Sequence, residues 1–254
     1  MLVAKMHGAR NDFVIVDGRA EPLTDAASFA RRICDRRAGV GADGCIVLER
    51  SDRADVRMRT INADGSEAEM CGNGIRCAAR WLDEAGEGDR IAFETPAGIV
   101  RTEVVAREPE YLVSVAMATP HSSAFEHPDV PDAAFVDTGN PHVVVVVADV
   151  DAFDLDAAAQ RLQRDPRFAG GVNVHAMTRR SDGALAVRHW ERGVGQTMAC
   201  GTGAIACAAV AVERGIASSP VELVVPGGRL VVRWDAAIVY LVGPAAHVFD
   251  ARLL

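Results

Sequence analysis

Short runs of alternating apolar and polar residues, rich in valine and isoleucine, recur along the chain and are separated by glycine, proline and acidic residues. Such runs are typical of β-strands with one face in a core. In the first half we expect strands at residues 13–16, 45–48, 56–61, 90–95 and 98–105. In the second half we expect them at residues 143–147, 185–190, 221–225, 229–234 and 238–242.

Two further segments predict helices, at about residues 73–85 and 202–214, which Gly86 and Gly215 would end. The second segment is apolar or small on nearly every side, which is typical of a helix enclosed by sheet. Shorter amphipathic helices are expected after Thr24 and after Asp154. The pattern therefore predicts an α+β chain.

An internal repeat organises these elements, because an offset of 129 residues carries Cys71 onto Cys200 in nearly identical surroundings, CGNGIRC and CGTGAIAC. The same offset relates Asn11 to Asn140, Arg59 to Arg188 and Asn62 to Glu191, and an offset of 130 relates Pro96 to Pro226. A duplication fixes the architecture. We expect two pseudo-symmetric domains, each a mainly antiparallel sheet wrapped around a central helix, with the site in a cleft between them.

The composition narrows the class of partner. The chain has 254 residues and a net charge of −8, without a lysine- or arginine-rich block, so nucleic acid is not an expected partner. No apolar run approaches the roughly 20 residues of a membrane helix. The opening residues lack the apolar stretch of a signal peptide, and we expect a cytoplasmic protein with no membrane partner.

Six cysteines occur, and in a chain of this size we expect reduced thiols. Four of them are interpreted as small core residues, namely Cys34, Cys45, Cys77 and Cys207. Cys71 and Cys200 each precede Gly-x-Gly at a predicted helix start. There the helix dipole and unpaired backbone N–H groups would lower a thiol pKa and hold a carboxylate.

Two such thiols facing one cleft suit the removal of a proton from one face of a carbon and the return of a proton to the other. The helix-start amides would stabilise charge that develops on the carboxylate of an amino acid. This racemase or epimerase chemistry requires no cofactor and no metal.

A metal- or redox-responsive thiol protein is the alternative from another class. In it, Cys71 and Cys200 would bind zinc or form a switch disulfide. The spacings of six residues from Cys71 to Cys77 and of seven from Cys200 to Cys207 are not usual zinc patterns.

Five motifs stand out in the sequence, namely NADGSEAEMCGNGIRC, GNPH, GVNV, ERGVGQTMACGTG and GPAAHVFD. Together they carry a specific resemblance to diaminopimelate epimerase, and the match runs from Met6 nearly to the C-terminus. That family is cofactor-independent and serves lysine and peptidoglycan precursor synthesis. Proline racemases and phenazine-biosynthesis isomerases share its duplicated architecture, and a racemase of another amino acid is the alternative within enzymes. The repeat predicts a boundary near residue 115, between an N-terminal domain of residues 1–115 and a C-terminal domain of 116–243. The resemblance implies that about 244–254 cross back to the first domain.

The resemblance implies that Cys71 and Cys200 are the acid and base that interchange LL- and meso-diaminopimelate. His142 and Glu191 would tune the pKa of the two thiols. The implied contacts to the reacting amino-acid head are Gly72, Asn73, Gly201 and Thr202. The further implied substrate-binding residues are Asn11, Asn62, Asn140, Asn173, Glu191 and Arg192.

Ordinary structural roles remain open for several of these residues. Asn11 and Asn140 could cap turns, His142 could be a structural histidine, and Arg192 could form a simple ion pair.

The chain also departs from the family pattern, with Gly44 where relatives have glutamine and Gln196 where they have glutamate. Phe249 replaces a tyrosine that relatives use at a dimer contact, so a homodimer would rest there on ring packing alone.

Overall fold

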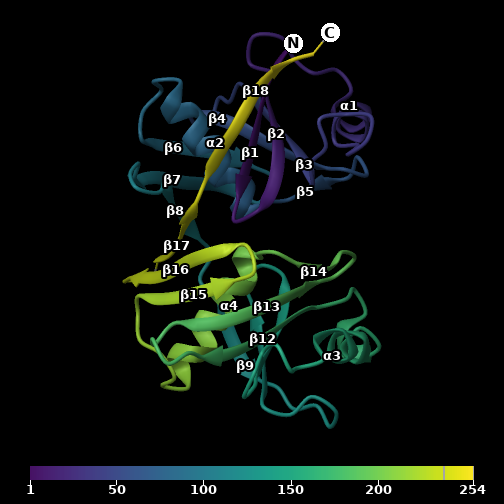
Figure 1. Ribbon diagram of the computed structural model, residues 1–254, viewed down its shortest axis with the longest axis vertical. Coiled ribbons are helices and arrows are strands. Elements are labelled where there is room, and N and C mark those ends of the chain that lie inside the picture. Colours follow the sequence, from purple (N-terminus) through teal and green to yellow (C-terminus); the bar gives the residue numbers. More distant parts are fainter. Residues whose placement is uncertain (237, 254) are drawn as a thin grey trace. The chain divides into compact units, whose positions relative to one another are not determined.

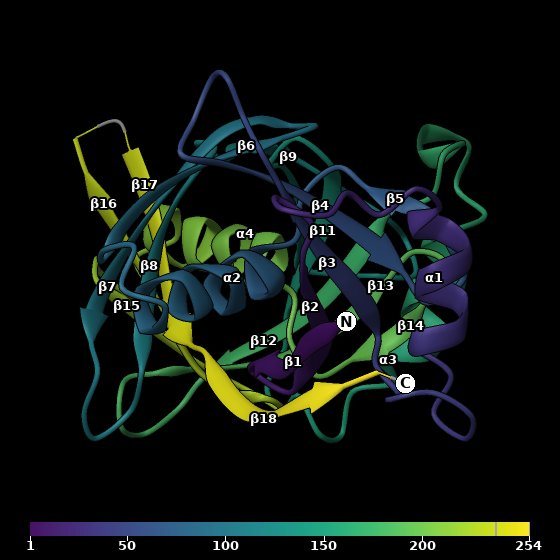
Figure 2. The same ribbon diagram turned by 90° about the horizontal axis from the view of Figure 1, so that it is seen from above.

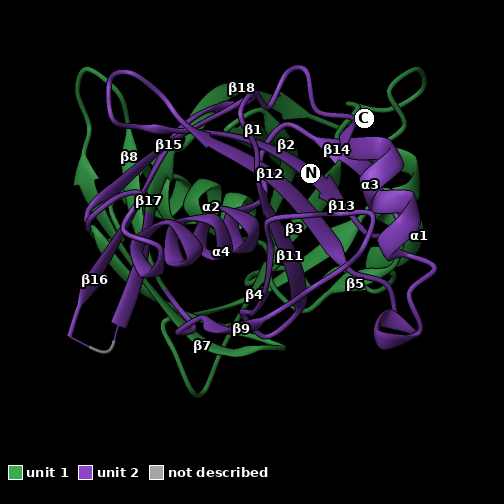
Figure 3. Ribbon diagram, turned by 90° about the horizontal axis from the view of Figure 1, so that it is seen from below, with its two compact units in different colours: residues 1–116, 242–254 green, residues 117–241 purple. Residues whose placement is uncertain are grey.

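The computed structural model describes residues 1–236 and 238–253. The chain forms two compact units, one of Met1–Ala116 with Val242–Leu254 and one of Met117–Leu241 (Figures 1 and 3). The expected α+β class with two domains is confirmed. Within the described residues, no helix is long and apolar enough to cross a membrane.

The first unit contains two helices among strands that follow one another along the chain. Its elements are β1 Leu2–Gly8, β2 Asn11–Asp17, α1 Ala26–Ile33, β3 Gly44–Glu49, β4 Val56–Asn62, β5 Glu67–Ala68, α2 Gly72–Glu84, β6 Arg90–Thr95, β7 Gly98–Ala106, β8 Leu112–Met117 and β18 Ala246–Arg252. Strand β1 is antiparallel to both β2 and β18, so the C-terminal strand lies beside the N-terminal one. Strands β2 and β3 are parallel, as are β4 and β6, whereas β3–β4, β4–β5, β6–β7 and β7–β8 are antiparallel.

The second unit repeats this arrangement. Its elements are β9 His121–Ala124, β10 Ala133–Asp137, β11 Pro141–Val146, α3 Leu155–Leu162, a 3₁₀ turn Pro166–Phe168, β12 Asn173–Arg179, β13 Leu185–Glu191, β14 Gly195–Thr197, α4 Gly201–Glu213, β15 Val221–Val225, β16 Gly228–Asp235 and β17 Ile238–Pro244, whose residues from Val242 onward belong to the first unit. The pairings β10–β11, β11–β12, β12–β13, β13–β14, β13–β15 and β15–β16 have the same directions as their counterparts in the first unit. Strand β9 lies beside β10 as β18 lies beside β1.

The element boundaries confirm the duplication. Helices α1 and α3 begin 129 residues apart, at Ala26 and Leu155, and α2 and α4 begin the same distance apart, at Gly72 and Gly201. Strands β4 and β13 also end 129 residues apart. The two halves therefore share one local plan of elements and pairings.

Each unit encloses one helix in its strands (Figures 2 and 3). Helix α2 contacts β1, β2, β7 and β18, and helix α4 contacts strands from β10 to β16. Nearly every residue of α4 is buried, which confirms the interpretation of its apolar composition. Helices α1 and α3 instead pack one face on β3 and β4 or on β12 and β13, and Asp25 and Asp154 cap their first turns.

The sequence pattern located the long helices to within one residue of their observed starts and ends. Gly86 and Gly215 follow them with φ of +83° and +66°, the left-handed conformation that ends a helix. The pattern missed β1, β5, β8, β9, β10, β12, β14 and β18. Some of these strands are very short and polar, such as β9, and others, such as β12, are buried on both faces and therefore do not alternate.

The third residue of each central helix provides a test of packing. A Cβ on Gly203 would lie 2.4 Å from Cε1 of His175, whereas the atom nearest to a Cβ on Gly74 would be the flexible end of Ile46, at 3.0 Å. Gly203→Ala should therefore lower the free energy of unfolding by about 3 kcal/mol, through overpacking against a fixed ring. Gly74→Ala should change it by less than about 1 kcal/mol. Denaturant unfolding of both variants would check this, and equal losses would contradict it.

Candidate active site

Both site cysteines cap the helix that follows them. Cys71 and Cys200 have extended backbones, and their Sγ atoms accept hydrogen bonds of 3.4 Å from the N–H groups of Gly74 and Gly203. The sulfur thus lies at the positive end of the helix dipole, beside N–H groups that have no partner within the helix. The sequence expectation of a thiol at each helix start agrees with this geometry.

In the first unit, Asn11, Cys71 and Asn73 come together. Asn11 Oδ1 accepts a hydrogen bond of 3.3 Å from Asn73 Nδ2 and a longer one of 3.8 Å from Cys71 Sγ. Asn11 begins β2 and Asn73 lies in the first turn of α2, so the pairing of a strand start with a helix start creates this group.

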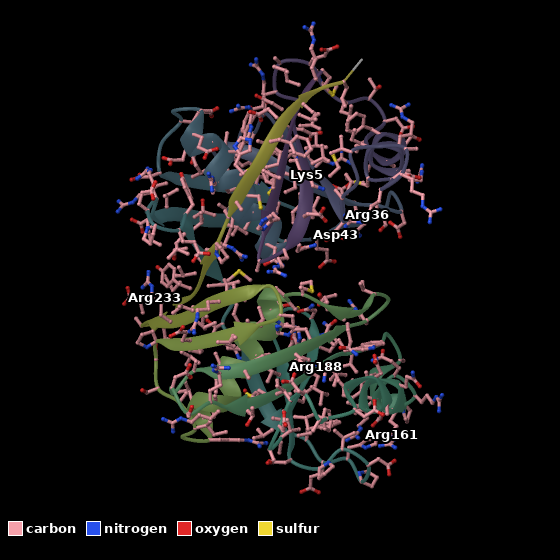
Figure 4. All side chains as sticks on the ribbon, in the orientation of Figure 1. Lys5, Arg36, Asp43, Arg161, Arg188 and Arg233 are labelled. Atoms are coloured by element: carbon pink, nitrogen blue, oxygen red, sulfur yellow. The ribbon has the colours of Figure 1, made fainter. Side chains whose placement is uncertain are left out.

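A network of charged side chains holds Asn11 in place, and Figure 4 labels three of its members, Lys5, Arg36 and Asp43. Asn11 Nδ2 donates to Asp43 at 2.8 Å, and Arg36 donates to both Asp43 and Asp12. Lys5 forms an ion pair with Asp12 at 2.5 Å. Burial disfavours the charged form of Asp12, but the hydrogen bonds from Arg36 and Lys5 outweigh it and hold the pKa of this carboxyl far below its ordinary value. The amide of Asn11 therefore donates to Asp43, which Arg36 links to Asp12.

Arg76 is a residue that the sequence reasoning did not single out. It is completely buried and donates to the carbonyls of Pro244 and Gly72, at 3.1 and 2.9 Å, and to Asn73 Oδ1 at 2.8 Å. Burial lowers the pKa of Arg76 to about 10, so it stays protonated at neutral pH. Among the described residues it forms no ion pair, and its charge lies beneath the first turn of α2. Its position in the CGNGIR motif, on the buried side of the helix, was the available signal.

Asn62 lies apart from this group. It is exposed at the end of β4, and its Nδ2 donates to Ser66 Oγ at 2.9 Å within a turn. The described contacts thus give Asn62 a role in the turn, and they do not join it to Cys71.

In the second unit, Cys200 lies against two polar side chains. Thr202 Oγ1 is 3.5 Å from Cys200 Sγ, and the Glu191 carboxyl is hydrogen-bonded with the thiol. Burial, followed by the charge of Glu191, raises the pKa of the Cys200 thiol well above its ordinary value. The sequence reasoning expected a lowered pKa at both helix starts. For Cys200 that was wrong, because desolvation and a neighbouring carboxylate outweigh the helix dipole.

Glu191 is itself shifted. Burial raises its pKa, although a 2.6 Å hydrogen bond from Thr197 Oγ1 and the contact with Cys200 favour the charged form. Thr197 lies on β14, which pairs with β13, so the hairpin between them positions the carboxyl beside the thiol.

Asn140 and His142 are joined at the start of β11. Asn140 Oδ1 accepts from Thr138 Oγ1 at 2.9 Å and lies 2.8 Å from His142 Nε2. The other ring nitrogen of His142 lies 2.8 Å from His175 Nε2. Because both ring nitrogens of His142 are occupied in this way, neither is hydrogen-bonded to a cysteine.

Asn173 and Arg192 brace neighbouring strands. Asn173 is buried, donates to the carbonyl of Pro141 at 3.2 Å and accepts from the backbone N–H of Arg192 at 3.1 Å. The Arg192 guanidinium is exposed and donates to the carbonyl of Gly170 at 2.9 Å. Arg192 forms no ion pair with any residue that the structure describes.

The departures from the family pattern have local explanations. Gln196 donates to Asp156 at 2.6 Å and accepts from Arg188, labelled in Figure 4, at 2.8 Å. Both ends of its amide are therefore hydrogen-bonded to residues other than Cys200. A Cβ on Gly44 would lie 3.0 Å from the carbonyl oxygen of Ile61, which leaves little space for a side chain.

The other four cysteines are buried in the two units, at Cys34, Cys45, Cys77 and Cys207. Burial raises the pKa of Cys77 to about 12 and that of Cys34 to about 11. Such thiols stay protonated and act as small core residues. In the described part of the chain, no group of three or more histidine, cysteine or acidic residues has a metal-holding arrangement.

Comparison with solved structures places the fold. A phenazine-biosynthesis protein of the PhzF family from Bacillus anthracis superposes with a TM-score of 0.78 at 19% identity, covering 100% of this chain and 99% of that one. A probable proline racemase from Agrobacterium radiobacter K84 superposes with a TM-score of 0.73 at 17% identity, covering 100% of this chain and 92% of that one. At these identities the likeness concerns the fold alone.

Comparison of sequences is more specific. The chain is 42% identical to the diaminopimelate epimerase of Desulforudis audaxviator, over 99% of both chains. It is 41% identical to that of Sphingopyxis alaskensis, over 98% of this chain and 95% of the relative. The model of the diaminopimelate epimerase family matches residues 3–122 and 134–248. The chain therefore belongs to the diaminopimelate epimerase family.

Proposed function

We propose that this chain interconverts LL- and meso-diaminopimelate by a cofactor-independent mechanism in which Cys71 and Cys200 exchange a proton with the substrate α-carbon. Membership of the family makes the chain an isomerase that acts on an amino acid. The observation that carries the mechanism is the repeated geometry, in which a cysteine sulfur caps each of the two enclosed helices.

The proton chemistry needs one thiolate and one thiol. The thiolate removes the α-proton, and the electron pair of the C–H bond spreads onto the substrate carboxylate. The opposite thiol then gives its proton to the other face of the carbon, so the two sulfurs exchange protonation states in each turnover. The buried position of Cys200 and its contact with Glu191 support Cys200 as the protonated partner in the substrate-free chain.

The helix starts would hold the reacting amino-acid head. The backbone N–H groups near Gly72, Asn73, Gly201 and Thr202 belong to first turns, where the dipole favours an anion. Gly72 and Gly201 have no Cβ and therefore leave those groups open to a ligand.

The distal amino-acid head would meet the remaining polar residues. We assign it Asn62, Asn140, Glu191 and Arg192, with Asn11 and Asn173 supporting the site. Arg192 is suited to a carboxylate because its exposed guanidinium is held by a single backbone carbonyl, at 2.9 Å, and can form a two-pronged contact.

A homodimer is the proposed working unit. Strand β18 presents two apolar side chains, Val248 and Phe249, which are 54% and 46% exposed. Leu2 on the paired strand β1 is 73% exposed. Exposed apolar side chains on paired strands favour association with a second copy.

The two-thiol mechanism predicts that Cys71→Ser and Cys200→Ser each lower kcat for diaminopimelate epimerisation by about 10³-fold or more, since each removes one acid or base. Turnover in heavy water should place deuterium on the α-carbon. The matched controls Cys77→Ala and Cys207→Ala, which alter only buried thiols of the same helices, should keep most of the activity. Near-native activity of either serine variant would contradict the mechanism, and turnover of proline in place of diaminopimelate would contradict the substrate.

The raised thiol pKa predicts a second effect. A negative charge beside Cys200 disfavours its thiolate, so Glu191→Gln should lower the pKa of the Cys200 thiol. The pH dependence of Cys200 alkylation, followed by mass spectrometry in a Cys71→Ser background, would measure this. Glu222→Gln, on an exposed strand position, is the control and should leave the profile in place. An unchanged profile for Glu191→Gln would mean that the carboxylate does not act on the thiol.

The dimer proposal predicts that Phe249→Asp converts a dimer into a monomer, because a charge would replace an apolar contact. Light scattering after size exclusion would give the mass. Val105→Asp, at another exposed apolar position in the same unit, is the control and should stay dimeric. A monomeric parent chain would contradict the proposal.

A further inference from the structure

Three histidines lie side by side in the core of the second unit. His142, His175 and His189 come from the neighbouring strands β11, β12 and β13, and they are 0%, 0% and 1% exposed. His175 is the direct cross-strand partner of His189. His142 lies two positions from the residue that pairs with His175, on the same face of the sheet. Neither His175 nor His189 was singled out from the sequence, since each occupies an apolar position of a strand.

The three rings form a continuous chain of hydrogen bonds that ends on Asn140. His189 Nδ1 lies 2.9 Å from His175 Nδ1, and His175 Nε2 lies 2.8 Å from His142 Nδ1. His142 Nε2 then lies 2.8 Å from Asn140 Oδ1. At the inner end, His189 Nε2 is buried and has no hydrogen-bond partner among the described residues.

All three rings are neutral at physiological pH. Burial lowers the pKa of His142 to about 3 and that of His189 to about 3, and it lowers the pKa of His175 well below its ordinary value. A neutral imidazole has one N–H donor and one acceptor nitrogen. A chain of three such rings can therefore run in only two directions, towards Asn140 or away from it.

The buried inner end decides the direction. If the chain donated away from Asn140, His189 Nε2 would carry an N–H with no acceptor. If it donates towards Asn140, the same atom carries only an unused lone pair. Orphaned buried N–H groups are rarer than under-used acceptors, so the second arrangement is favoured. His142 then donates to Asn140 Oδ1. This agrees with the hydrogen bond that Thr138 Oγ1 donates to the same oxygen.

We propose that His175 and His189 are positioning residues that set the orientation of the Asn140 amide, so that its Nδ2 donates to a carboxylate oxygen of the substrate. The proposal rests on the proposed function, which makes Asn140 a substrate-binding residue. Among the described contacts, Asn140 Nδ2 has no hydrogen-bond partner within the protein. The opposite amide orientation would turn a carbonyl oxygen towards the substrate and would repel a carboxylate.

The packing of His175 keeps this chain rigid. Its ring lies so close to Gly203 that a Cβ there would be 2.4 Å from Cε1 and 2.7 Å from Nε2. Gly203 is the residue whose N–H donates to Cys200 Sγ. The ring that orients Asn140 therefore also supports the first turn of α4 beneath the thiol.

A proton relay does not fit this geometry. A relay needs an exit for the proton, whereas the inner end at His189 Nε2 is closed off by burial. The outer end is an amide oxygen, which does not pass a proton on at neutral pH. The three hydrogen-bonded histidines are suited to orienting the Asn140 amide and not to transferring a proton.

Substitution at His189 tests the proposal, because this residue touches neither Asn140 nor Cys200 in the described contacts. His189→Leu removes the first donor, frees His175 and His142 to change tautomer and lets the Asn140 amide flip. We expect KM for diaminopimelate to rise about tenfold, the equivalent of one hydrogen bond to a charged group, with kcat changed less than threefold. His189→Asn, whose amide nitrogen stands in for Nδ1, should restore KM to within about twofold of the parent.

Two further variants separate positioning from general loosening of the core. Val187→Ala weakens the same strand at a buried apolar position and should leave KM unchanged even though it lowers stability. In an Asn140→Ala background, His189→Leu should raise KM no further, since the group that it orients is absent. A KM rise with Val187→Ala, or an additive effect in the Asn140→Ala background, would overturn the proposal.

Nitrogen-15 NMR of the histidine rings tests the direction of the hydrogen bonds between the three histidines without any turnover of substrate. The parent protein should show the N–H on Nε2 of His142 and His175 and on Nδ1 of His189, and His189→Leu should mix the tautomers of His142. An Nδ1–H tautomer of His142 in the parent would overturn the proposal even if the protein epimerises diaminopimelate. If the tautomers are as expected but the protein has no activity on diaminopimelate, the result would contradict the proposed function. It would still support the hydrogen-bonded row of histidines that orients Asn140.

Discussion

A helix that begins inside a sheet must find partners for its first backbone N–H groups, and this requirement governs both halves of the molecule. In each unit, a cysteine sulfur accepts one of these N–H groups, from Gly74 or Gly203. Sulfur is a weak acceptor, so the first turn retains capacity for an anionic ligand. The same structural need that places the thiol therefore also creates the site where a carboxylate can bind.

The two units support these helix starts in different ways. In the first unit the support is a buried cation of α2 itself, Arg76, which donates to Asn73 Oδ1 and to the carbonyl of Pro244. Beneath α4 lies a neutral imidazole, His175, in contact with Gly203. Beside Cys200 there is also a carboxyl, Glu191, at the position equivalent to Asn62 in the first unit. Duplication gave the same scaffold twice, and substitution at a few supporting positions made the surroundings of the two thiols electrostatically unequal. A reaction that needs one thiol and one thiolate benefits from this inequality.

Several amides expected to face a substrate are used within the protein. Asn73 accepts from Arg76, Asn173 bridges Pro141 and Arg192, and Asn62 holds a turn. A buried amide must be hydrogen-bonded, and the buried Asn73 and Asn173 meet this need within the protein, whereas Asn62 is exposed and bonds within its own turn. Their contribution is to hold neighbouring atoms still, which a site for proton transfer requires as much as direct contact with the substrate.

The sequence by itself determined the duplication, the two enclosed helices with their ends, the cysteine at each helix start and the family, because periodicity, capping and glycine stops act over a few residues. Only the tertiary structure decided the protonation of Cys200, which depends on burial and on Glu191 from another strand. It also decided the inward turn of Arg76 and the alignment of His142, His175 and His189. The three histidines meet through strand pairing between distant segments. Register and burial of that kind are set by the packing of the whole unit, and no local pattern in the sequence records them.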